Sequence, residues 1–143
     1  MKFKYSKWKC PRSEAFPQRI SALRPVIHIT IKYQNQRLRV FALLDTGADY
    51  CLFPKWMGEK LGIPIQKGKK LEYKGAAGGI RNAYFHDVVL EIGGWKNKCY
   101  VGFTYEPKEE ERHFGILGTI GFFDKYEVIY NFKKNEIKVK ELT

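Results

Sequence analysis

The sequence of 143 residues lacks any apolar run that approaches the roughly 20 residues of a membrane-spanning helix. It also lacks a start of the signal-peptide type, because its first residues, MKFKYSKWKC, alternate lysine with aromatic side chains. Internal repeats and low-complexity tracts are absent too. These absences argue against a membrane span and a secreted protein, and a cytoplasmic protein is the prediction.

Cysteine is scarce, since only Cys10, Cys51 and Cys99 occur, far apart and without a CxxC pair. The three histidines form no ligand pattern with them, so a structural zinc site is not expected. We expect reduced thiols, at least two of them buried as small hydrophobic side chains. No metal or organic cofactor is predicted.

Acidic residues are few, with 15 Asp and Glu against 26 Lys and Arg and a net charge of +11. Part of the excess lies in residues 1–24, which contain seven basic side chains and one acidic residue: Lys2, Lys4, Lys7, Lys9, Arg12, Arg19 and Arg24 against Glu14. Such charge favours nucleic acid, anionic surfaces or acidic partners. No zinc finger, RRM-type motif or recognition helix accompanies it, so a nucleic-acid or anionic-surface binder is an alternative and not the leading interpretation.

Apolar residues are plentiful at 44%, with ten Phe and nine Tyr, which is enough for a core. Residues 26–33 are β-branched and nearly alternating, and residues 37–44 alternate before becoming continuously apolar; both patterns predict strands. Short helices are predicted over residues 54–61 and in the residues leading to Lys125. Further strands are predicted over residues 71–74, 80–92, 95–104, 127–132 and 137–140.

Many short strands, little helix and no βαβ rhythm predict an all-β barrel or sandwich. The predicted organisation is one domain over residues 25–143, preceded by a basic N-terminal arm over residues 1–24 that packs only loosely.

The apolar run that ends at Leu44 delivers Asp45 out of a buried strand, where a lone charge would be costly. Such a carboxylate needs hydrogen-bond donors. Thr46 offers a hydroxyl group, and Gly47 lets the backbone approach and present its N–H groups. Asp45 is therefore a candidate catalytic group, although an Asp-Thr-Gly triplet alone is also an ordinary turn sequence.

Two other segments strengthen this interpretation. Ile116, Leu117 and Gly118 form a second apolar segment that ends in glycine and could pack beside the Asp45 loop. The glycine-rich stretch Gly75-Ala76-Ala77-Gly78-Gly79 lies between the two and has the composition of a lid that closes on an extended ligand.

In this order the segments resemble a retropepsin-like aspartic protease, the single-domain retroviral type found also in cellular genomes. Residues 43–48 match the catalytic loop, residues 75–79 the flap, and residues 116–118 the segment before a short C-terminal helix, so that the resemblance spans residues 25–141. It implies an all-β, closed barrel-like acid protease fold with one or two short helices.

The resemblance also implies an aspartic endopeptidase that works as a homodimer on extended polypeptides. Two carboxylates must share one proton and hold one water between them. Of the four Asp residues, only Asp45 is followed by Thr-Gly or Ser-Gly, so the second catalytic carboxylate must come from another copy.

Other roles follow from the same resemblance. Thr46 would join the two catalytic loops, and Gly47 would supply backbone contacts. Ala48 stands where some relatives carry a hydroxyl that stabilises the ionised pair, which predicts a weakly acidic working pH. Asp49 would bind the substrate backbone, but its usual Arg partner is replaced by Thr119, so that either Arg37 or Arg39 substitutes or Asp49 is simply solvated.

The flap residues Gly75, Ala76, Ala77, Gly78 and Gly79 would hydrogen-bond an extended peptide by strand addition. The alternative for these residues is that they form only the tip of an ordinary β-hairpin. A non-proteolytic peptide-binding dimer of the same fold is the second alternative for the whole protein.

Overall fold

The computed structural model describes residues 1–75, 78–107 and 112–143. Most of its regular structure is β-strand, with one six-residue α-helix, α1 (Lys55–Lys60), and one turn of 3-10 helix, η1 (Ile65–Lys67), in the described part. The chain is thus all-β, as the sequence predicts. Within these ranges no helix is long and apolar enough to cross a membrane.

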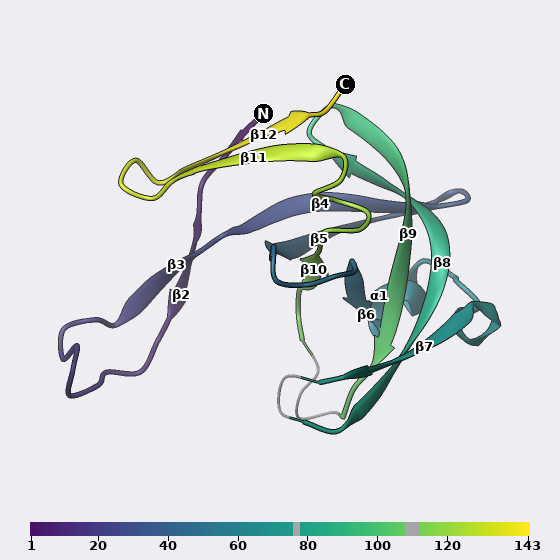
Figure 1. Cartoon of the computed structure of the whole chain (residues 1–143), viewed down its shortest axis with the longest axis horizontal. Coiled ribbons are helices and arrows are strands. Elements are labelled where there is room, and N and C mark those ends of the chain that lie inside the picture. The colour runs from purple at the N-terminus through teal and green to yellow at the C-terminus, as the bar shows by residue number, and fades with distance from the viewer. Residues whose placement is uncertain (76–77, 108–111) are drawn as a thin grey trace.

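A seven-stranded sheet in the order β4-β5-β10-β6-β9-β8-β7 makes up the body (Figure 1). An additional antiparallel pairing of β4 with β8, in which Ile31 lies opposite Leu90, closes this sheet into a ring and leaves β7 outside it. The strands are β4 (Val26–Tyr33), β5 (Gln36–Leu44), β6 (Leu52–Pro54), β7 (Lys69–Lys74), β8 (Ile80–Ile92), β9 (Trp95–Tyr105) and β10 (Gly115–Leu117).

The ring encloses the core because its strands turn alternate apolar side chains inward. On β4, Ile27, Ile29 and Ile31 are almost fully buried while His28 between them is exposed. The same alternation buries one face of its neighbours. Further core residues on these strands are Val40, Ala42, Leu44, Leu90, Ile92, Val101 and Phe103.

A smaller antiparallel sheet in the order β1-β12-β11 joins the two ends of the chain. Its strands are β1 (Lys2–Phe3), β11 (Tyr126–Asn131) and β12 (Glu136–Glu141). The termini lie close together in Figure 1, because β1 pairs with β12 and Val139 donates its N–H to the Met1 carbonyl at 2.8 Å.

The arm also contains a hairpin that the sequence did not indicate. β2 (Ser6–Lys9) pairs with β3 (Ser21–Arg24), and this two-stranded sheet extends from the body in Figure 1. Its register places Trp8 opposite Ala22, which is buried. The division of the chain at residue 24 stays a prediction.

One predicted element is wrong. The residues leading to Lys125 form turns and not a helix, since Gly121 adopts a φ of +107° and interrupts the helical path. The Asp124 carboxylate accepts the Gly121 N–H at 3.1 Å, which stabilises the turn. The segment packs an aromatic side chain into the core, since Phe122 is fully buried.

Candidate active site

The segment that carries Asp45 is fixed by a parallel strand pairing. β5 and β10 lie in parallel register, with Leu44 opposite Leu117. Asp45 extends the ladder by one bond, since its N–H donates to the Leu117 carbonyl at 3.0 Å. The Asp45 backbone therefore starts from a rigid position at the end of a core strand.

The Asp45 side chain folds back onto its own loop. Gly47 donates its N–H to Asp45 Oδ1 at 2.9 Å, and Ala48 donates to the Asp45 carbonyl at 3.1 Å. A Cβ on residue 47 would lie 3.2 Å from the same Oδ1, so glycine leaves room for the close approach. Asp45 is partly buried and Thr46 is exposed. The carboxylate is thus oriented by the backbone and still open to a ligand.

Gly118 brings the second predicted segment against this loop. A Cβ on residue 118 would lie only 2.7 Å from the Ala48 carbonyl oxygen and closer still to that of Tyr50. Two backbone bonds follow at once, from Thr119 to the Ala48 carbonyl and from Ile120 to the Asp49 carbonyl, both at 2.9 Å. The structure therefore places residues 116–118 directly beside the Asp45 loop.

Cys51 lies beneath the contact between the two segments. Its Sγ accepts the Gly118 N–H at 3.4 Å and contacts the Ile120 carbonyl at 3.6 Å. Burial raises the pKa of the Cys51 thiol to about 12, so it stays protonated and acts as a small packed group. Cys51 and Cys99 are both free and buried, as the sequence predicts.

The small terminal sheet approaches the loop through Tyr130 of β11. The pKa of Tyr130 is raised by burial first, and then by the nearby Tyr5 and Asp45. A negative charge on Asp45 therefore contributes to the raised pKa of Tyr130 on β11, although the two residues are far apart in the sequence. Short-range sequence patterns gave no sign of this neighbour.

The strands β7 and β8 form the predicted hairpin, whose turn lies at Gly75, Gly78 and Gly79. Gly75 donates to the Gly79 carbonyl and Gly78 to the Gly75 carbonyl, both at 3.0 Å. Gly78 and Gly79 have φ values of +84° and +80°, which favour glycine. Ala76 and Ala77 lie outside the described residues.

A cavity of about 250 Å³ lies between this hairpin and the loop that follows Asp45. Tyr50 and Ile120 line it from the loop side, and Leu71 of β7 from the hairpin. Lys69 and Lys70 lie at its edge. An apolar side chain of a ligand could enter this cavity. In the sequence, the alternation of polar and apolar residues in the Lys-Leu-Glu-Tyr stretch of β7 is the signal that could have predicted its apolar wall.

Neither predicted arginine partner forms an ion pair with Asp49 among the described residues. Asp49 is exposed, and in the part of the chain that the structure describes it forms no ion pair. Arg37 pairs instead with Glu91 at 2.6 Å. Thr119 donates its hydroxyl to the Asp49 carbonyl at 3.2 Å, which fixes the backbone of Asp49 and leaves its carboxylate free.

No group of three His, Cys, Asp or Glu side chains that could hold a metal ion occurs among the described residues. In this loop the Asp45 carboxylate and the backbone N–H groups beside it are the polar groups that can meet a ligand.

Comparisons with known proteins concern the family and the fold of this chain. A family model described as "Aspartyl protease" matches residues 28–119. A search of curated proteins gave no match. Among solved structures, a retropepsin-like aspartic protease from Rickettsia conorii matches with a TM-score of 0.60 and 16% identity over 98% of both chains. EIAV protease with the inhibitor HBY-793 matches with a TM-score of 0.47 and 24% identity over 66% of this chain and 81% of that one.

Proposed function

Because the chain belongs to the aspartyl protease family and has a retropepsin-like fold, we propose that it is an aspartic endopeptidase with Asp45 as its catalytic carboxylate. The observation that carries the proposal is the Asp45 loop, in which the carboxylate is oriented by the Gly47 N–H at the end of a core strand.

The reaction needs two such carboxylates with one shared proton. The ionised carboxylate takes a proton from the bound water as the water attacks the scissile carbonyl, and the protonated one donates a hydrogen bond to the carbonyl oxygen. One chain supplies only one Asp45, so the second must come from a second copy related by a two-fold axis.

Support for the dimer comes from the position of β11. It is the edge strand of the terminal sheet, and its outer side pairs with no described strand. Ile129 and Tyr130 on it are 53% and 42% exposed, and Tyr130 lies within electrostatic reach of Asp45. Pairing of two β11 strands across the axis would cover this apolar edge and bring the two Asp45 loops together.

The other loop residues take supporting roles in this proposal. Thr46 is exposed at the loop tip, where it can contact the partner's loop, and Gly47 orients the carboxylate. Asp49 has a free carboxylate for the substrate backbone, and the β7–β8 hairpin can add a strand to an extended peptide. Ala48 brings no hydroxyl to stabilise the ionised pair, so a weakly acidic pH optimum is expected.

A diverse peptide library tests the proposal, with cleavage measured between about pH 4 and 7 for the wild type and Asp45→Asn. The wild type should cleave, and Asp45→Asn should be slower by at least about a hundredfold because the general base is lost. Asp87→Asn is the matched control, since Asp87 is exposed on β8. Absence of cleavage at concentrations where ultracentrifugation demonstrates a dimer would favour the non-proteolytic peptide-binding dimer.

A further inference from the structure

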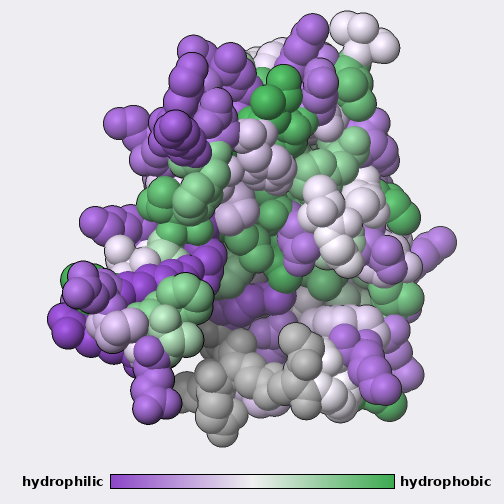
Figure 2. Space-filling model, turned by 60° about the vertical axis from the view of Figure 1, so that its left-hand side comes forward, coloured by the Kyte–Doolittle hydropathy of each residue, from purple (hydrophilic) through white to green (hydrophobic). Residues whose placement is uncertain are grey.

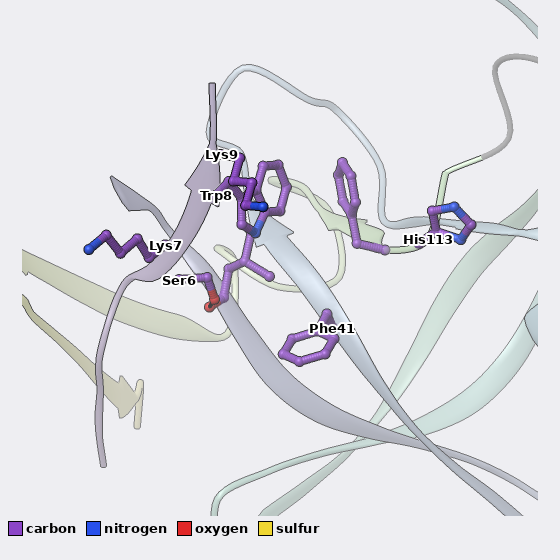
Figure 3. Close-up of a pocket in the computed structure, with 8 residues that line it drawn as sticks. Ser6, Lys7, Trp8, Lys9, Phe41 and His113 are labelled. Carbon is purple, nitrogen blue, oxygen red and sulfur yellow. Dashed lines mark hydrogen bonds between the residues drawn. The ribbon is translucent and has the colours of Figure 1, made fainter. Parts of the chain in front are cut away.

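A second cavity lies under the arm hairpin, against the strand that leads to Asp45, and has no role in the proposed reaction. Its volume is about 720 Å³, which is within the range of ligand sites. Trp8 of β2 and Phe41 of β5 face it from opposite sides (Figure 3). Val26, His113 and Phe114 complete much of its wall. Figure 2 shows hydrophobic surface between hydrophilic flanks on the side that carries the hairpin.

The wall is built from fixed aromatic side chains. Trp8 packs against Phe114 with ring centroids 5.1 Å apart, and Ser6 donates its hydroxyl to the Val26 carbonyl at 3.0 Å, which ties the hairpin to β4. Phe41 is 45% exposed although it lies on a strand of the main sheet. Much apolar ring area therefore remains available to a guest side chain.

The cavity is continuous with the strand face that leads to Asp45. Side chains alternate along β5, so that Phe41, Leu43 and Asp45 point to the same side, away from the buried Ala42 and Leu44. Four residues of extended chain separate Phe41 from Asp45, which corresponds to about 13 Å. Consider a peptide that lies extended along this face with its scissile bond at Asp45. The side chain that it places in the cavity would lie about four residues from that bond.

Two lysines flank the apolar wall. Lys9 lines the cavity, and Lys7 also borders it while its side chain points outward in Figure 3. Within the described ranges no carboxylate forms an ion pair with Lys7 or Lys9. Acidic residues on either side of the guest side chain would complement these cations.

We propose that the cavity between Trp8 and Phe41 is a substrate subsite, which takes a large apolar side chain flanked by acidic residues about four positions from the cleaved bond. This role rests on the proposed function. A single-stranded nucleic acid could also use aromatic and basic groups, but a cavity on the same strand face as Asp45 fits a peptide better.

The first test compares cleavage of one randomised peptide library by the wild type and two arm variants, Trp8→Ala and Phe16→Ala. The wild type should enrich large apolar residues with acidic neighbours about four positions from the cut. Trp8→Ala should lose this enrichment and keep its preferences next to the cut. Phe16→Ala should behave as the wild type, because Phe16 is 63% exposed and does not line the cavity. Cleavage without the enrichment overturns the subsite and leaves the proposed activity standing.

A binding measurement separates the two proposals without cleavage. The probe is a fluorescein-labelled octapeptide with one phenylalanine between pairs of glutamates, measured by anisotropy with the Asp45→Asn protein. Replacing the phenylalanine by glycine, or adding Trp8→Ala, should weaken binding at least about tenfold because a buried aromatic contact is lost. If the wild-type protein binds the peptide but cleaves no peptide in the library, both the proposed activity and the subsite role are overturned. Trp8-dependent binding of labelled oligothymidylate in place of the peptide overturns the subsite in favour of nucleic acid.

Discussion

Replacing Gly118 by alanine perturbs the contact that holds the Asp45 loop in place. The added Cβ would lie 2.7 Å from the Ala48 carbonyl oxygen and closer still to that of Tyr50, whereas ordinary contact begins at 3.4 Å, so the two segments must separate by at least about 0.7 Å. The neighbouring bond from Thr119 to the Ala48 carbonyl is 2.9 Å long and would stretch to about 3.6 Å, which is no longer a hydrogen bond.

The cost follows from these changes. Loss of two backbone hydrogen bonds between the segments costs about 1 kcal/mol each, and the overpacking costs a further 1 kcal/mol or more, about 3 kcal/mol in all. For a chain of this length that lowers the midpoint of thermal unfolding by about 10 °C. A shift of Asp45 by even a fraction of an ångström should also reduce kcat by about tenfold to a hundredfold.

Urea denaturation and peptide cleavage measure the two effects in Gly118→Ala. Gly94→Ala is the matched control, because no atom lies within 4 Å of a Cβ there and its φ is not in the left-handed region. The control should stay within about 0.5 kcal/mol of the wild type. If Gly118→Ala is as stable and active as Gly94→Ala, the reasoning that this contact positions the loop is refuted.

Two other predictions concern the dimer edge and the thiols. Ile129→Lys should weaken the proposed dimer, so that activity falls at low protein concentration and returns at high concentration. Phe16→Lys on the arm hairpin should change neither the dimer fraction measured by ultracentrifugation nor the activity. Equal dimerisation of both variants would exclude β11 as the interface. In the native protein iodoacetamide should modify Cys10 alone, because Cys51 and Cys99 are buried with raised pKa values, and all three should react in urea. Rapid native labelling of Cys51, detected by mass spectrometry, would contradict the packing beneath the loop.

The sequence predicted the four long strands of the ring, β4, β5, β8 and β9, because their signal is local, but it did not predict the three-residue strands β6 and β10. Residues 26–33 and 80–92 alternate apolar and polar side chains, and the structure has strands over the same residues. The order of those strands was not predictable in the same way. The parallel pairing of β5 with β10 joins residues more than 70 positions apart, and the sequence suggested only that residues 116–118 could pack beside the Asp45 loop.

The misses have physical causes. A short helix was predicted before Lys125, but Gly121 and the Asp124 carboxylate favour turns there. The arm hairpin was missed because its strands are only four residues long, because β2 contains two lysines, and because a long loop separates the two strands. The position of Cys51 beneath the Asp45 loop was not predicted, because a small buried side chain gives no sequence pattern that distinguishes it from any other core residue.

The arm is bound too closely to the body for its deletion to be a clean test of its charge. Phe3 packs against the main core, Tyr5 donates its N–H to Asn135 Oδ1 at 2.9 Å, and Met1 exchanges backbone hydrogen bonds with Val139. Removal of residues 1–24 would therefore uncover β12 and the terminal sheet beside Asp45, so that lost binding or activity would follow from damage to the fold. Trp8→Ala removes one partly exposed ring and leaves β1 in place, and it is this change that separates a role of the arm in binding from its role in holding the sheet.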